Sequence, residues 1–319
     1  MTQARFRRLA AITLAATLAV ILWGAFVRAS GSGAGCGSHW PMCNGEVIPR
    51  GRGAATLIEF THRATSGVAF LLVALQLVWA RRAFPAGHPV RGGAAWSMFF
   101  MVTEAAIGAG LVLFEYVAQN ASMARAAWMS AHLINTFLLV AAMTCTLWWA
   151  SGGPAVRLRG QGATLPLLAA ALLGTLAVGV TGAIAALGDT LFAAPSLREG
   201  LAQDLSPGAH LLVQLRVIHP ILAALVAAYL LVARTVVAAR RPSPAARRLS
   251  TALGALVAAQ IAAGLVNFAL LAPVWMQLVH LLLADLLWMA LVTLATAALG
   301  EPAAEASPKR AGGAAALPA

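Results

Sequence analysis

Long apolar segments, separated by short polar ones, follow one another along the whole chain. A transmembrane helix needs about 20 consecutive, mainly apolar residues, and eight segments reach this length. We predict spans at residues 9–29, 56–80, 95–115, 126–150, 164–187, 211–235, 249–272 and 275–298. Only 10% of the residues are charged, against about 25% in a soluble domain. The chain is therefore predicted to be an all-α integral membrane protein.

The first apolar segment follows three arginines and could instead be a signal peptide. Its length, and the lack of a clear small-residue cleavage motif after it, favour a retained span.

The basic residues predict the orientation of the spans. The net charge is +12, and 15 of the 22 basic residues lie at alternate ends of the spans, on one side of the membrane. These are Arg5, Arg7, Arg8, Arg81, Arg82, Arg91, Arg157, Arg159, Arg234, Arg240, Arg241, Arg247, Arg248, Lys309 and Arg310. The positive-inside rule makes that side cytoplasmic, with both termini there. The charge is thus explained by topology, and no nucleic-acid partner is expected.

A basic loop divides the chain into two halves of four spans each. We expect an N-terminal half at 1–155, a C-terminal half at 156–300, and a disordered cytoplasmic tail at 301–319 that is rich in Ala, Gly and Pro. Four histidines recur at matched places. His62 and His219 occur early in the second span of each half, and His132 and His280 in the outer part of the fourth. We therefore predict two pseudo-repeated four-helix bundles that run in the same direction.

Ionisable residues inside a membrane are costly and are functional-site candidates by default. Each of the four histidines lies about 8–10 Å below the outer end of its helix, at 1.5 Å per residue. Two imidazoles at one depth on facing helices can bind a single haem iron from opposite faces. The alternatives are polar contacts between helices and zinc, which would lack third and fourth ligands. The pattern predicts two haem sites in the extracytoplasmic half of the bilayer.

The halves differ one turn before the first histidine. Glu59 precedes His62, whereas Arg216 precedes His219 at the same spacing, and residues three apart share a helix face. A carboxylate beside a haem can accept protons or stabilise positive charge, and a guanidinium suits the haem propionates. The alternative for Glu59 is an ion pair with Arg63, its i+4 neighbour. We expect the first site to be reactive and the second to hold a cofactor.

The first external loop carries Cys36 and Cys43, two of the three cysteines of the chain. In an oxidising compartment such a pair persists as a disulfide, which in the chain-entropy model stabilises by roughly 2–2.5 kcal/mol. A redox role is the alternative.

The third span of each half carries a small-residue segment, which begins at Glu104 and at Gln260 and contains Gly108 and Gly264. These glycines serve either close helix packing or a flat ligand.

The run from Gly31 through Trp40, Pro41 and Cys43, followed by Ile58-Glu59-Phe60-Thr61-His62-Arg63, resembles the haem A synthase family. The resemblance covers residues 10 to 298. It implies an enzyme that oxidises the C8 methyl group of haem O to a formyl group in two hydroxylations, for use in cytochrome oxidase. The oxygen would come from water, and electrons would pass through haem b to an acceptor, expected to be a membrane quinone.

Carried over by motif, the resemblance places substrate haem O at His62 and His132 with Glu59 beside it, and haem b at His219 and His280. It also implies a bacterial inner-membrane location and a haem O synthase as partner. Some members have a second cysteine pair in the third external loop, but residues 188–210 contain none here. The competing interpretations are a di-haem b-type electron carrier, with two permanently bound haems, and a transporter without haem.

Overall fold

The computed structural model describes residues 2–50 and 53–300, and it confirms an all-α membrane protein. Its helices long and apolar enough to cross a membrane number eight, as predicted. They are α1 (Gln3–Ala29), α2 (Ala54–Ala83), α3 (Pro89–Leu113), α4 (Met123–Ala150), α5 (Thr164–Leu191), the sixth span ending in α8 (Ile218–Arg240), α9 (Pro244–Ala269) and α10 (Val274–Gly300). The predicted tail at 301–319 lies outside the described residues.

Most helices extend beyond the predicted spans. α2, for example, runs to Ala83 and includes Arg81 and Arg82, and α9 begins at Pro244, ahead of Arg247 and Arg248. Hydropathy marks only the part of a helix that lies in the hydrocarbon core. The polar end turns continue the same backbone hydrogen bonding and therefore stay helical.

The sixth span is interrupted near its outer end. It consists of α7 (Leu211–Gln214), a 3₁₀ turn η1 (Leu215–Val217) and α8. Pro220 has no N–H to donate to the carbonyl of Arg216, four residues before it, which explains the local change. A short helix that the hydropathy pattern does not mark, α6 (Leu197–Asp204), precedes this span. Ser196 caps α6 by accepting a hydrogen bond from the backbone N–H of Glu199 at 3.3 Å.

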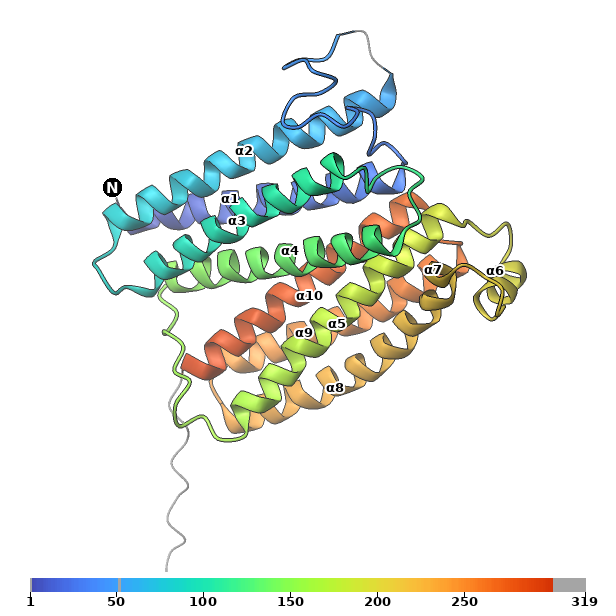
Figure 1. Cartoon of the computed structure of the whole chain (residues 1–319). Helices are drawn as coiled ribbons and strands as arrows, with labels where there is room; N and C mark the ends of the chain where they lie inside the picture. The colour runs from blue at the N-terminus through green and yellow to red at the C-terminus, as the bar shows by residue number, and fades with distance from the viewer. Residues whose placement is uncertain (1, 51–52, 301–319) are drawn as a thin grey trace, which may run out of the picture.

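The spans form two closed four-helix groups (Figure 1). In the first, α1 packs on α2, α2 on α3, α3 on α4, and α4 on α1. In the second, α5, α8, α9 and α10 pack in the same cyclic order. The matching order supports the predicted repeat. The loop after α1 and α6 lie at one end of the molecule, and α1 begins and α10 ends at the other.

The two groups meet mainly through α4, which packs on α5 and α10, and through α1, which packs on α10. At the centre of this seam Phe137 stacks on Trp288 with ring centroids 5.2 Å apart. The indole N–H of Trp288 donates to the carbonyl of Phe137 at 2.7 Å. At the outer end of the seam, Arg28 of α1 donates to the carbonyl of Ala186 and the hydroxyl of Thr190 on α5, at 2.8 and 2.7 Å.

Arg28 also donates to the side chain of Gln277 on α10 at 2.8 Å, so it joins both halves. We expect Arg28→Met to lower the thermal unfolding temperature of the purified protein, because hydrogen bonds to a charged group contribute about 1.5–3 kcal/mol each. Arg8→Met, on the same helix at an exposed position, is the matched control. Equal unfolding temperatures for the two variants would contradict the bridging role.

Candidate functional site

The four histidines of the spans each face a glycine on the preceding transmembrane helix of the same half. A methyl group added to the glycine would lie 2.8 to 3.8 Å from Cε1 of the imidazole. The pairs are Gly24 with His62, Gly108 with His132, Gly182 with His219, and Gly264 with His280. Three of the four distances are shorter than an ordinary carbon–carbon contact, so only glycine leaves room for the ring. The same pairing occurs in both halves, which places the histidines in equivalent positions.

The two histidines of the second half lie close together. The ring centroids of His219 and His280 are 6.4 Å apart, and the ring planes are perpendicular. Two imidazoles that bind one metal ion from opposite faces, each at about 2 Å, have ring centres roughly 6 Å apart. Thr181 lies 3.3 Å from Nδ1 of His219, and Gln260 lies 3.3 Å from Nε2 of His280. The separation therefore fits an axial pair for a single iron.

The histidines of the first half, His62 and His132, occupy the matching positions on α2 and α4, and each ring faces its glycine. Among the described residues, Nδ1 of each ring is buried and has no hydrogen-bond partner. A buried polar group normally has a partner. These two unpartnered nitrogens lie on α2 and α4, in the outer part of one bundle. Their positions are consistent with two imidazoles that bind a common ligand.

Glu104 on α3 is the carboxylate nearest to the first pair. Its Oε1 lies 3.5 Å from Nδ1 of His132, longer than a good hydrogen bond. Asn135 donates to Oε2 of Glu104 at 2.6 Å, and the hydroxyl of Thr136 donates to Oε1. The corresponding residue of the second half is Gln260, beside His280. From the sequence, Glu104 begins the small-residue segment and is a candidate to line the first cavity, but its spacing from His132 could not indicate this contact.

Glu59 is 3% exposed, and both of its carboxylate oxygens have partners. Arg63 donates to Oε1 at 2.6 and 3.1 Å, which is the i+4 ion pair considered above. The backbone N–H of Cys36 donates to Oε2 at 2.9 Å. Glu59 therefore joins the first external loop to α2, one turn outside His62.

The first external loop contains the predicted disulfide between Cys36 and Cys43, with an S–S distance of 2.05 Å. Two further contacts hold this loop on α2. The hydroxyl of Thr56 donates to the carbonyl of Gly35 at 2.7 Å, and Arg63 donates to the carbonyls of His39 and Met42. The loop is thus fixed over the outer end of the helix that carries His62.

Arg216 lies in η1 and is buried beside two carboxylates. Its Nη1 is 3.1 Å from Oδ1 of Asp189, at the outer end of α5, and its Nη2 is 2.8 Å from Oδ1 of Asp204, at the end of α6. Asp189 belongs to the end of the fifth span and Asp204 to the short helix that follows it, and the sequence pattern did not connect either residue with Arg216. The predicted propionate contact of Arg216 stays a prediction.

The remaining ionisable candidates lie apart from these pairs. His88 and His210 cap α3 and α7 by accepting hydrogen bonds from Val90 and Leu212. Asp285 on α10 is completely buried, and its two oxygens have no hydrogen-bond partner among the described residues. Cys145 packs against the core and lies 3.4 Å from the hydroxyl of Thr296.

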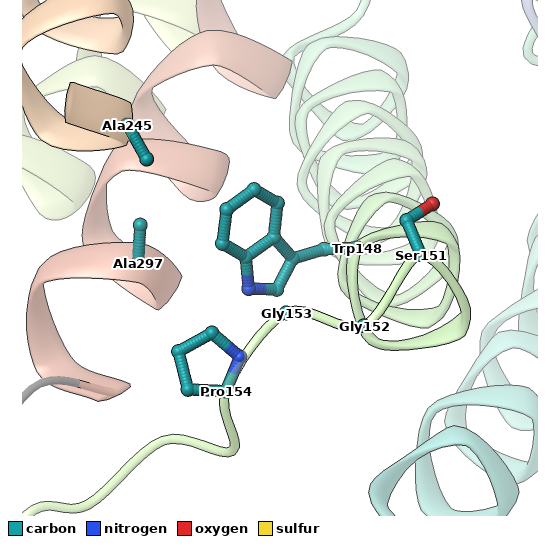
Figure 2. A pocket seen from close by; sticks show the side chains of 7 residues that line it. All are labelled: Trp148, Ser151, Gly152, Gly153, Pro154, Ala245 and Ala297. Carbon is teal, nitrogen blue, oxygen red and sulfur yellow. The ribbon is translucent and has the colours of Figure 1, made fainter.

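A pocket of about 240 Å³ opens at the other end of the molecule, where the loop after α4 meets α9 and α10. Figure 2 shows the ring of Trp148 and Pro154 on one side of it and Ala297 on the other. Trp148 lies 16 residues after His132 on α4, about 24 Å along the helix. This pocket is therefore separate from the histidine pairs.

Comparison with known proteins relates the chain to haem metabolism. A protein of Thermus thermophilus named protoheme IX farnesyltransferase is 56% identical over 280 residues, which are 88% of this chain and 46% of that protein. Heme A synthases of Shouchella clausii and Bacillus mycoides are 40% and 41% identical over 108 and 106 residues, or 34% and 33% of this chain. Those alignments cover 36% and 34% of the two synthases. The chain thus spans less than half the length of each of these relatives.

A family model described as COX15-CtaA, cytochrome oxidase assembly protein, matches residues 7–292, which include all the transmembrane histidines described above. The match covers most of the length, and the chain belongs to the COX15-CtaA family.

Proposed function

We propose that this protein is a haem A synthase of a bacterial inner membrane, which oxidises the C8 methyl of haem O to a formyl group. The observation that carries the proposal is the pair His219 and His280, whose 6.4 Å ring separation suits one iron, together with an equivalent pair, His62 and His132, in the other half. Family membership and the heme A synthase relatives point to the same chemistry.

In this proposal His219 and His280 hold haem b, with Gly182 and Gly264 leaving room for their rings. When bound, haem b supplies one-electron transfer. His62 and His132 bind the iron of the substrate haem O and fix its depth. Arg216 carries a positive charge at the outer end of the second site, where it can assist propionate binding alongside its contacts to Asp189 and Asp204.

The reaction converts the methyl group in two similar steps. In each, one water supplies oxygen and two electrons and two protons leave; CH₃ becomes CH₂OH and then CH(OH)₂, which loses water to give CHO. Glu59 and Glu104 are the carboxylates available to accept protons in the first half, and proton acceptance by a positioned group contributes typically 10²–10⁴-fold. The two electrons released in each step pass to a two-electron acceptor, which we take to be a membrane quinone.

The route for electrons between the halves follows the seam. His132 lies on α4 and His280 on α10, and these helices pack together. Phe137 and Trp288 stack between them, five and eight residues along from the respective histidines. The aromatic contact holds α4 and α10 together on the inner side of the two proposed haem sites, and electron transfer from the first half to the second would cross this helix interface.

A haem O synthase is the proposed supplier of substrate. The Thermus relative bears the name of a protoheme farnesyltransferase, and this chain matches only 46% of it. That relative is named for the farnesylating step and also contains a region similar to this chain. This supports the successive action of a haem O synthase and a haem A synthase on the same haem.

Conversion of haem O tests the proposal directly. Purified protein loaded with haem O and a quinone in H₂¹⁸O should form hydroxylated haem and haem A that carry ¹⁸O, detected by mass spectrometry of the extracted haems. His62→Ala should abolish the conversion and keep haem b. Permanent haem b in both sites with no conversion would instead indicate a di-haem electron carrier, and protein without haem would indicate a transporter.

The two roles open to Glu59, proton acceptor and anchor of the loop, can be separated by a pair of variants. Glu59→Gln should lower haem A formation by about 100-fold if the carboxylate accepts protons, with haem b content unchanged. Arg63→Gln breaks the same ion pair and the contacts to His39 and Met42 but leaves the carboxylate, so it should have a much smaller effect. Equal losses in both variants would assign Glu59 to loop positioning, and full activity of Glu59→Gln would exclude an essential acid–base role.

A further inference from the structure

The cytoplasmic half of the first bundle has a polar interior. One buried polar side chain comes from each of its four helices, and none of them is more than 5% exposed; they are Thr13, Gln76, Ser97 and Thr144. The rings of Phe6 on α1 and Phe84 at the end of α2 are in contact and mark one depth. Thr13 lies seven residues further into the bundle than Phe6, and Gln76 lies eight residues further in than Phe84. Thr13 and Gln76 are therefore at nearly the same depth.

Ser97 and Thr144 lie at a similar depth. They are four and two residues inward from Gly93 and Thr146, which are in contact across α3 and α4. The main packing partners of α2 are α1 and α3, so the buried side chain of Gln76 belongs to the interior of the bundle. The four side chains therefore form one layer across it, which we call the polar layer.

The polar layer lacks hydrogen-bond partners. Within the described chain, neither the oxygen nor the nitrogen of the Gln76 amide has one, and the hydroxyl of Thr144 has none either. Thr13 and Ser97 donate to carbonyls of their own helices, which leaves their oxygens free to accept. A buried amide without partners is costly, and polar interior sites of this kind typically hold water that makes two to four hydrogen bonds.

The equivalent layer of the second bundle is apolar. The two halves can be aligned helix by helix on their glycine–histidine pairs. In this alignment the residues that match Thr13, Gln76, Ser97 and Thr144 are Ala171, Ala233, Leu253 and Val292, and all four are buried. Near the same depth in the second half, the guanidinium of Arg234 donates to the backbone carbonyl of Ser250 at 3.4 Å. These two residues match Leu77 and Ala94 of the first half, which are not members of the polar layer.

The same difference continues toward the histidines. One turn inward from Gly108 and His132 lie Glu104 and Thr136, with Asn135 beside them; in the second half these positions are Gln260, Ala284 and Leu283. Thr17, about 10 Å inward from Gly24, has a like counterpart, Thr175. The reverse difference occurs once: where the second half has the buried Asp285, the first half has Phe137.

We propose that the first bundle holds a chain of bound water that runs from the polar layer, past Thr17, to Glu104, beside the site at His62 and His132. Gln76 lies about 21 Å inward from His62 along α2, and about 8 Å from Arg81 at its cytoplasmic end. The ligand of this site is water; the polar layer is the inner end of the chain and Glu104 the outer end, next to His132.

The asymmetry matches the chemistry of the two halves, and this part rests on the proposed function. Each oxidation in the first half consumes one water and releases two protons, whereas the second half passes only electrons. Water supply and proton exit are therefore needed beside the first site, where the polar layer and Glu104 lie.

Radiolytic labelling in H₂¹⁸O tests the water chain independently of activity, because hydroxyl radicals label a buried methionine only where water lies beside it. Met101 is the reporter: it is 7% exposed and shares a helix face with Ser97, four residues away. We expect ¹⁸O at Met101 in the holoenzyme and its loss in Gln76→Leu. In Val257→Met, which places a reporter at the matching position of the second half, the substituted residue should stay unlabelled.

The rate of haem A formation tests whether the proposed water chain takes part in the reaction. Gln76→Leu and Thr17→Val should lower haem A formation about tenfold, with haem b content and unfolding temperature maintained. Thr175→Val, the matched substitution in the second half, should leave it unchanged.

The outcomes separate the two proposals. Absence of ¹⁸O at Met101, or equal labelling at position 257 of Val257→Met, overturns the water chain whether or not haem A forms. Labelling at Met101 with unchanged turnover in Gln76→Leu overturns its role in the reaction. If the unaltered protein forms no haem A, the proposed function fails, and the labelling result alone decides whether the first bundle holds water.

Discussion

The contact between an imidazole and a glycine on the neighbouring helix is the constraint on which the arrangement depends. An imidazole inside a bilayer is costly unless it has a partner, and its ring needs space that a packed helix interface seldom offers. Gly24, Gly182 and Gly264 provide this space at the depth of a histidine, and Gly108 faces His132 in the same way at an ordinary contact distance. Because these contacts recur in both halves, they fix two pairs of imidazoles in the outer part of the membrane region.

The two halves use this shared frame differently. The first half has two carboxylates near its pair: Glu59 ties the disulfide loop to α2, and Glu104 lies beside His132. In the second half, Arg216 and Gln260 take the equivalent places, and the layer that matches the polar layer is apolar. A duplicated scaffold with Glu104 beside an imidazole in the first half and Gln260 in its place in the second suits one reactive site and one site that passes electrons.

Much of this architecture could be predicted from the sequence because the bilayer makes strong demands on it. Apolar length predicts the eight spans, and the recurrence of the four histidines predicts their matching positions in the two halves. The small-residue segment led to Gly108 and Gly264, but Gly24 and Gly182 carry no such signal, since they lie among ordinary apolar residues of the first and fifth spans. Likewise α6 is too short and too polar for a hydropathy pattern to mark.

Contacts between distant side chains were the least predictable part. The partners of Arg216 come from α5 and α6, and Glu104 reaches His132 across a helix interface. No spacing rule connects such residues. The i+4 pair of Glu59 and Arg63, by contrast, follows from helix geometry alone. The polar layer around Gln76 became visible only when burial and the register of the two halves could be compared.

The identity of the haems held by each half tests the central claim most directly. The protein would be purified from a host that makes haem O, and its haems extracted, separated and weighed, for the unaltered chain and for His62→Ala and His219→Ala. We predict haem b with haem O or its oxidised products in the unaltered protein, haem b alone in His62→Ala, and loss of haem b in His219→Ala. The same haem in both halves, or loss of the same haem from both variants, would contradict the assignment of substrate to the first bundle and cofactor to the second.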